Sequence, residues 1–394
     1  MNKTRIVTAL SALLATTLTA CGGGGGGGAT PGTNQPPVAK AVAQDITDTG
    51  VNVALDGSAS MDADGDRLSY TWTIVSKPAN SSATVGSATS AKATFIPDAA
   101  GKYTLTLVVN DGHADSAPVM LEVLAATPLG GVITQNTVLS AERSPYRLVS
   151  DVTVPQNVAM TVNPGVEILG VGRKLGVQGV LNVAGSQAAP VSLKDLTIRR
   201  ENLGTDAAYI QACQVNIAWA QVSGGAVYAP NPSWSACQFS LTDSKLSQTQ
   251  LIEIVQGWGA NKIERNVFER SAGISYSLGS EAPNKTTLEI VNNKFVEWTD
   301  SFAIRNTGMS GNAEATVKYN SFISTDRVAL EVKTNQAGAG GIARIDGREN
   351  FWGTTDLTGI YRMIKTEATT QGLGGADSIL VTPFLSEAHP MTPR

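Results

Sequence analysis

The sequence predicts an all-β protein in which a β-sandwich is followed by a right-handed parallel β-helix. A pattern of inward-facing residues recurs seven times in the second half of the chain, every 22 to 30 residues. Short alternating apolar runs, separated by turns that contain Asp and Gly, occupy residues 38–124. Only 16% of the residues are charged and 40 are Gly. This composition and the two-residue alternation favour strands and turns over helices.

The first 20 residues form a predicted signal peptide. Lys3 and Arg5 precede a short apolar run over residues 6–18. A run of this length is too short to span a bilayer in the mature protein, and its flanks are typical of a cleaved leader. We therefore exclude residues 1–20 from the predicted fold.

The junction Leu18-Thr19-Ala20-Cys21 resembles the lipobox of bacterial lipoproteins. The resemblance implies that Cys21 is lipidated and attaches the protein to a membrane; the alternative is ordinary secretion. Residues 21–37 are rich in Gly, Thr and Pro and predict a flexible tether. Because no Asp follows Cys21, the analogy favours the outer membrane, with the folded part facing either the periplasm or the outside.

Residues 38–124 predict an immunoglobulin-like sandwich. Alternating apolar residues indicate strands at 51–55, 68–74 and 103–109. Trp72 is the expected core tryptophan and Tyr103 the expected tyrosine-corner residue. The runs Asp56-Gly57-Ser58, Gly101-Lys102-Tyr103 and Asn110-Asp111-Gly112 resemble PKD-type domains. The resemblance implies a spacer or contact module rather than a catalytic domain.

Asp62, Asp64 and Asp66 alternate along one turn of this domain. Three carboxylates at this spacing could bind one Ca²⁺, although Thr73 stands where an EF-hand loop has Glu. The alternative interpretation is an Asp-rich turn whose side chains accept hydrogen bonds from backbone amides.

Residues 131–388 predict the β-helix, because repeats of this length stack as coils of a solenoid. Two positions of the repeat define its inward face. The first comprises Val191, Val215, Phe239, Asn261, Leu288, Ala315 and Ile345. The position seven residues later comprises Ile198, Val222, Leu246, Phe268, Phe295, Phe322 and Trp352. Between them, the last four coils align Asn266, Asn293, Asn320 and Asn350. We expect a structural ladder at an inside corner, where Asn tolerates the left-handed conformation.

The runs Met160-x-Val162 and Asn350-Phe351-Trp352-Gly353-Thr354 resemble the entry and closing coils of pectate-lyase-like β-helix proteins. The resemblance implies that any activity would lie on an outward face, with carboxylates, Ca²⁺ or an Arg or Lys base. Cys213 and Cys237 are one coil apart, so they should meet on neighbouring strands and form a disulfide. The alternative is a stacked pair of thiols.

The outward positions predict no catalytic pair. Asp243 neighbours Arg265 and Lys262 neighbours Glu289, as in ordinary cross-strand pairs. The weak catalytic candidates are Glu253, Arg305, Glu331 and Lys333. Aromatic residues of the coils could stack on sugar rings or pack at corners: Trp219, Trp234, Trp258, Trp298, Tyr228 and Tyr276.

The leading functional hypothesis is a lipid-anchored envelope protein whose PKD-like domain is a spacer and whose non-catalytic β-helix binds a polysaccharide or surface protein. The alternatives are a polysaccharide lyase or hydrolase of the pectate-lyase-like superfamily, and a structural adhesin or spacer. The net charge of −4 without a basic cluster argues against nucleic acid. With only His113 and His389, histidine-based catalysis and histidine-ligated zinc or haem are disfavoured. The only cofactor that the sequence suggests is calcium, at Asp62, Asp64 and Asp66.

Overall fold

The computed structural model divides the chain into two compact units, Met1–Thr127 and Pro128–Arg394. It describes residues 33–201, 213–229, 237–255, 259–278, 286–309, 314–324, 327–333, 345–366 and 379–394. The boundary falls inside strand β7 (Val119–Val132), between the predicted domain ends at 124 and 131. Both units are all-β, as predicted. Over the described residues, no helix is long and apolar enough to cross a membrane.

The first unit is an immunoglobulin-like sandwich of two sheets. In one sheet β6 lies between β3 and β7 in antiparallel fashion, and β1 joins β7 in parallel. The other sheet has the order β2-β5-β4 and is antiparallel. The strands are β1 (Ile46–Asp48), β2 (Val53–Asp56), β3 (Ser69–Ser76), β4 (Val85–Gly86), β5 (Lys92–Phe95) and β6 (Gly101–Asn110).

Two aromatic residues organise the core of this unit. Trp72 of β3 is buried and donates its indole N–H to the Ser90 carbonyl at 3.0 Å. Tyr103 of β6 is fully buried, and its hydroxyl donates to the Ala99 carbonyl at 3.0 Å, four residues upstream. Gly57 packs beside the core, where an added Cβ would lie 2.7 Å from Leu107. These contacts fit the predicted core tryptophan and tyrosine corner.

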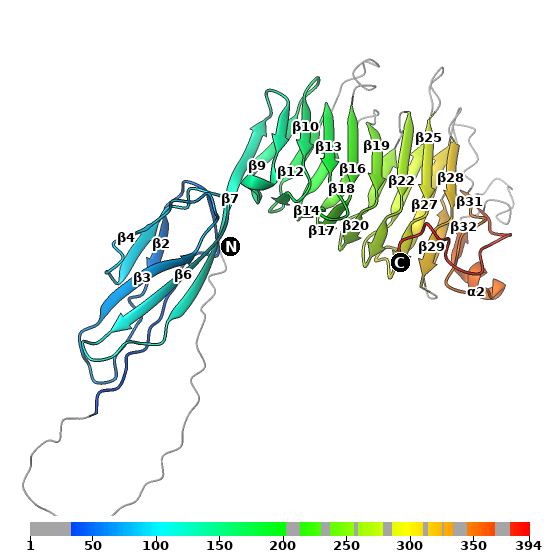
Figure 1. Ribbon diagram of the computed structural model, residues 1–394. Helices are drawn as coiled ribbons and strands as arrows, with labels where there is room; N and C mark the ends of the chain where they lie inside the picture. The colour runs from blue at the N-terminus through cyan, green and yellow to red at the C-terminus, as the bar shows by residue number, and fades with distance from the viewer. Residues whose placement is uncertain are drawn as a thin grey trace, which may run out of the picture. The chain divides into compact units, whose positions relative to one another are not determined.

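The second unit is a parallel β-helix whose coils contribute strands to three sheets. Figure 1 shows these strands following one another along the stack. Coil sheet 1 has eight parallel strands in stacking order. They are β8 (Thr137–Leu139), β10 (Ala159–Val162), β13 (Val180–Ala184), β16 (Gln214–Ala218), β19 (Gln238–Thr242), β22 (Ala260–Glu264), β25 (Thr287–Val291) and β28 (Glu314–Lys318).

Coil sheets 2 and 3 begin together at β9 (Tyr146–Val154), which pairs with the first strand of each. Coil sheet 2 continues through β11 (Glu167–Leu169), β14 (Val191–Lys194), β17 (Ala220–Ser223), β20 (Lys245–Ser247), β23 (Val267–Glu269), β26 (Lys294–Val296) and β29 (Ser321–Ile323). Coil sheet 3 begins with β12 (Lys174–Val177), β15 (Thr197–Arg200) and β18 (Ala226–Ala229). Strand pairing is interrupted after β18, and the sheet continues on the neighbouring coils through β21 (Ile252–Val255), β24 (Ile274–Leu278), β27 (Phe302–Met309), β30 (Val328–Val332) and β32 (Ile364–Thr366).

A few short elements complete the second unit. The 3-10 helix η1 (Ala141–Arg143) precedes β9. At the other end, β31 (Ile345–Asp346) pairs with β33 (Ile379–Leu380). The helix α2 (Leu357–Arg362) begins at Asp356, whose carboxylate accepts from the amides of Thr358 and Gly359.

The first of the seven predicted repeats is out of register. The repeat pattern aligns Val191 with Val215, but Val191 lies in coil sheet 2 opposite Ala220. Leu181 is the true neighbour of Val215 in coil sheet 1. The alternation over residues 175–183 covers two strands, β12 and β13, which are separated by a corner. The error arises because each corner of a coil has the same sequence pattern. Apolar and polar residues alternate, the alternation is interrupted at the corner, and it then resumes. The pattern therefore fits two different corners of the same coil.

The interior beyond this point stacks like on like, as the repeat predicts. Rings from successive coils form one column in the core. The ring centroids are 4.6 Å apart from Phe268 to Phe295, 5.4 Å from Phe295 to Phe322 and 5.3 Å from Phe322 to Trp352. Burial of such a column removes a large apolar area from water and stabilises the stack.

The polar ladder follows the corner between coil sheets 1 and 2. Asn266, Asn293 and Asn320 each donate their backbone and side-chain N–H groups to the side-chain oxygen of the next asparagine, at 2.8–3.1 Å. The last acceptor is Asn350, and all four residues are fully buried. Ser244 extends the ladder by one coil, because its backbone N–H donates to the Asn266 side chain at 2.9 Å.

The ladder residues themselves are not in the left-handed conformation, contrary to our expectation. The residue before each rung takes the positive φ, from 52° at Asp243 to 61° at Glu349. That residue turns the chain, and its side chain is partly exposed at every corner except Asn292, which is buried. The following Ser or Asn points inward and satisfies the backbone groups of the turn.

Candidate functional site

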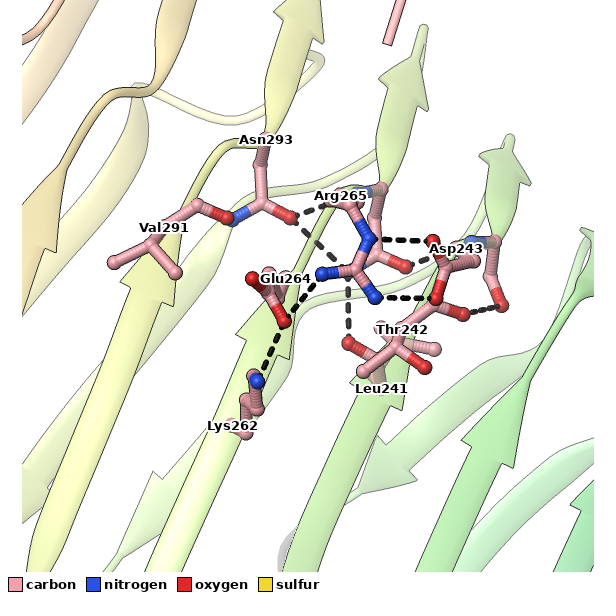
Figure 2. Close-up of polar contacts among 10 residues, drawn as sticks. Leu241, Thr242, Asp243, Lys262, Glu264, Arg265, Val291 and Asn293 are labelled. Carbon is pink, nitrogen blue, oxygen red and sulfur yellow. Dashed lines mark hydrogen bonds and ion pairs between the residues drawn. The ribbon is translucent and has the colours of Figure 1, made fainter. Parts of the chain in front are cut away.

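A group of charged side chains lies on the outer surface of the β-helix, where β22 ends. Arg265 donates to both carboxylate oxygens of Asp243, from Nε at 2.6 Å and Nη2 at 2.8 Å. Its Nη1 lies 2.7 Å from Glu264 Oε2, and Lys262 Nζ lies 2.6 Å from the same oxygen. Figure 2 shows these four residues, which we call the corner cluster, beside the buried Asn293.

The coil geometry accounts for this arrangement. Asp243 and Arg265 hold the same left-handed corner position on successive coils, with φ of 52° and 56°. Lys262 and Glu264 are two residues apart on β22 and therefore share its outward face. Stacking of coils then brings two acids and two bases together. The sequence prediction did not include the outward position of Glu264, although the alternation contained that signal.

The electrostatics of the corner cluster favour a stable ionic structure. The hydrogen bond that Arg265 donates to Asp243 raises the pKa of the guanidinium, and Glu264 contributes to the same shift. Glu264 is mostly buried, with 10% of its side chain exposed. Each carboxylate contacts a cation, and the four charges cancel. Both carboxylates of the corner cluster are therefore held by Arg265, and Glu264 is also held by Lys262.

The sequence pattern predicts that Lys262 lies beside Glu289, and the two residues are opposite each other on β22 and β25. The ion pair of Lys262, however, is with Glu264 on its own strand. Glu264, two residues away on the same face of β22, and Glu289, on the neighbouring strand, could both pair with Lys262. The folded corner places Glu264 in contact with it.

A second charged group lies on the outward face of coil sheet 3 and contains most of the predicted catalytic candidates. The register aligns Glu253, Ser275, Arg305, Glu331 and Lys365 on consecutive strands. Arg305 Nε is 2.5 Å from Glu331 Oε2, and Lys365 Nζ is 2.9 Å from Glu331 Oε1. We call these last three residues the sheet-3 triad.

Glu331 is the centre of the sheet-3 triad, and only 1% of its side chain is exposed. Burial alone would raise the pKa of Glu331, but the contacts from Lys365 and Arg305 outweigh burial and lower it. The Arg305 guanidinium also lies 3.7 Å above the centre of the Phe302 ring. Glu331 is thus a single acid held between two bases.

The structure brings together some of the predicted candidates. Arg305 pairs with Glu331, while Glu253 lies in the same column two strands from Arg305. Lys333 follows β30, and its backbone N–H donates to the Asn306 carbonyl at 2.9 Å. Lys365, which contacts Glu331, was not among the predicted candidates. The spacing between successive strands of coil sheet 3 varies along the sequence, so the residues that align on neighbouring strands do not recur at a fixed interval.

The three aspartates of the first unit form a turn. Asp62 Oδ1 accepts from the amides of Asp64 at 2.9 Å and Asp66 at 3.0 Å. Asp64 accepts instead from the amide of Gln35 at 2.7 Å. This geometry matches the turn-capping alternative. Across the part of the chain that the structure describes, no cluster of three Asp, Glu, His or Cys side chains could hold a metal ion.

The two cysteines of the β-helix are joined. Cys213 and Cys237 lie on neighbouring coils, each fully buried, with Cα atoms 4.7 Å apart and a disulfide between them. Cys21 and the remainder of the leader and glycine tract lie outside the described residues, so lipidation stays a prediction.

Three of the six aromatic candidates are packing residues. Trp298, Tyr228 and Tyr276 are buried, and Trp298 meets Phe322 edge to face at 6.4 Å. Trp234 and Trp258 lie outside the described residues. Trp219 remains partly exposed at a corner of coil sheet 1.

One cavity adjoins coil sheet 2, and the sequence carried no signal for it. It measures about 350 Å³ and lies between Lys294 and Ser321 on one side and the C-terminal segment on the other. The His389 ring lies 4.6 Å from the Tyr319 ring, and Thr392 donates to the Tyr319 carbonyl at 2.9 Å. These contacts hold the segment against the coils.

Comparison with known proteins identifies the first unit. Residues 42–123 match the model of a protein family that is described as a PKD domain. The first unit is thus a PKD domain, and a PKD domain followed by a β-helix fits a surface or spacer role. No curated protein matches the chain.

One solved structure has local sequence similarity. It is described as a nucleoside hydrolase-related hypothetical protein from Saccharophagus degradans that is associated with carbohydrate metabolism. The identity is 26% over 23% of this chain and 25% of that chain, with a TM-score of 0.19. The chain therefore spans about a quarter of that relative.

Proposed function

We propose that this protein is a lipid-anchored envelope protein whose β-helix binds a polysaccharide or a surface partner without turning it over. The PKD domain is then a spacer between the tether and the β-helix. The lipobox-like junction at Cys21 motivates the anchor, and the signal-peptide pattern before it motivates export.

The pairing of outward carboxylates is the observation that most directly favours a non-catalytic role. Asp243 and Glu264 both contact Arg265, and Glu331 contacts Arg305 and Lys365. General acid–base catalysis needs a group that can exchange a proton with the substrate. A carboxylate held between two cations is suited instead to keeping a rigid surface.

A binding and turnover assay tests this function. The purified full chain should bind at least one polysaccharide from a panel of neutral and anionic chains. The same samples should release no new reducing ends and no unsaturated product. Turnover that disappears in Arg305→Ala or Glu331→Gln would establish the competing lyase or hydrolase function.

The control is the Thr316→Ala variant, which changes an exposed residue of β28 away from both charged groups. It should bind like the wild type. The absence of binding to every polysaccharide, together with capture of a defined envelope protein by the same β-helix, would shift the proposal to the protein partner.

A further inference from the structure

Four consecutive strands of coil sheet 1 present an outward surface without charge. The central column aligns Thr161 of β10, Asn182 of β13, Asn216 of β16 and Ser240 of β19. The flanking outward residues include Val180, Ala184, Gln214, Ala218, Gln238 and Thr242. We call this surface the amide strip.

The amide strip differs from the rest of the β-helix surface. The next strand of the same sheet begins the corner cluster with Lys262 and Glu264. Coil sheet 2 carries ion pairs such as Lys245 with Glu269, and coil sheet 3 carries the sheet-3 triad. Among the described strands, the lack of charge is therefore a feature of one face of the early coils.

The amides of the strip are oriented by one another. Asn216 Nδ2 donates to Asn182 Oδ1 at 2.9 Å, one coil away. Within the described part of the chain, Asn182 Nδ2 and Asn216 Oδ1 have no hydrogen-bond partner. Gln238 Nε2 is fixed by the Ala260 carbonyl at 2.9 Å. The strip thus offers both donors and acceptors at fixed positions, which is what sugar hydroxyls require.

An aromatic ring borders the strip. Trp219 follows β16 in the corner position that Asp243 and Arg265 hold on the next two coils, with φ of 52°. Its backbone is tied to both neighbouring coils, because its N–H donates to the Thr242 carbonyl at 3.1 Å and its carbonyl accepts from the Val191 amide at 3.0 Å. Trp219, which is partly exposed, is therefore anchored through its backbone at the corner that borders the amide strip.

We propose that the amide strip binds an extended neutral polysaccharide, with Trp219 stacking on a sugar ring. Parallel strands repeat about every 4.8 Å, close to the length of one hexose unit in an extended chain. Successive coils could then bond successive sugars. An anionic polysaccharide would need cationic side chains, which the strip lacks. A protein-binding surface would be expected to present more large aromatic side chains, which become buried when the partner binds.

This inference rests on the proposed function and narrows it to one ligand class and one face. Its test is titration of cellohexaose, xylohexaose and hexagalacturonate into the purified full chain. The wild type should bind a neutral oligosaccharide, and its affinity should be equal at low and high salt because no charge is involved. Trp219→Ala and Asn216→Ala should each weaken that affinity about tenfold, through lost stacking or hydrogen bonds.

Two controls keep the result interpretable. Thr316→Ala lies in the same outward column, beyond the strip, and should leave the affinity unchanged. Gln214→Ala is the second strip variant if Asn216→Ala lowers the unfolding temperature.

The outcomes separate the two proposals. Preference for hexagalacturonate, or neutral binding that none of the strip variants weakens, would overturn the amide strip while leaving polysaccharide binding intact. Failure of the wild type to bind any of the three saccharides would overturn the amide strip, and the proposed function would then rest on a protein partner.

Discussion

At the scale of single residues, the polar groups of the buried ladder in the second unit are satisfied by their counterparts one coil away. Asn293 illustrates this arrangement. Its side-chain nitrogen donates to Ile263, Val291 and Asn320, and its side-chain oxygen accepts from Asn266. A buried polar group that loses its partner costs free energy, so each rung depends on its neighbours.

We predict that Asn293→Ala lowers the free energy of unfolding by about 1–3 kcal/mol, because partners on two coils lose a hydrogen bond. Chemical denaturation of the purified chain measures the change. Polysaccharide binding at the native temperature should be unaffected. An unchanged unfolding midpoint with lost binding would show that the ladder is a binding site rather than a scaffold.

Glu331 gives a second prediction, through the pH dependence of stability. Its folded-state pKa is lowered, so its ionic contacts stabilise the fold above its ordinary value of 4.5. That contribution is lost as the pH falls through the folded-state pKa. Glu331→Gln should therefore destabilise the protein near neutral pH by about 1–3 kcal/mol, with a smaller difference in acid.

Denaturation of the wild type and Glu331→Gln across the acidic range measures this dependence. Glu289→Gln, which changes an exposed carboxylate of coil sheet 1, serves as the control. A difference between wild type and Glu331→Gln that grows as the pH falls would contradict the assigned direction.

At the scale of the elements, the corner between coil sheets 1 and 2 couples backbone shape to surface chemistry. The corner residue adopts a positive φ and turns outward, while the next residue points into the ladder. Side chains at the corner are consequently free to vary between Trp219, Asp243, Arg265 and Tyr319. The same backbone turn can carry an aromatic ring on one coil and an ion pair on the next.

The pairing of β16 with β19 leads to a prediction about the cysteines at their starts. We expect Cys213 and Cys237 to be bridged in the exported protein, because parallel pairing in register brings their Cα atoms to 4.7 Å. Mass spectrometry of unreduced peptides should find the linked pair. Recovery of two alkylatable thiols from freshly isolated protein would favour the alternative of stacked thiols. The Cys213→Ala, Cys237→Ala double variant should lose about 2–4 kcal/mol of stability.

At the scale of the whole molecule, the chain combines a predicted leader, a glycine-rich tether, a PKD domain and a β-helix in that order. This order is what motivates a role at the cell envelope.

We predict that Cys21→Ser releases the protein from membranes, because the variant lacks the thiol that a lipid would modify. Fractionation of cells that produce the full chain measures this, with Cys213→Ala as the matched cysteine control. A Cys21→Ser protein that remains in the membrane fraction at mature size would rule out the lipid anchor.

Patterns in the sequence were enough to predict the fold class, the aromatic column and the position of the Asn rungs. These features depend on local alternation and on a repeat length, both of which are visible in one dimension. The sequence patterns also placed Asp243 beside Arg265, because residues at equal offsets in successive coils must stack.

Three features could be seen only in the folded coils: the register of Val191, the corner cluster around Glu264 and the contact of Lys365 with Glu331. The physical reason is that each corner of a coil shows a similar pattern, while loop lengths differ between coils. Hydrogen bonding between strands selects one register, and that register decides which outward side chains meet and which faces remain uncharged.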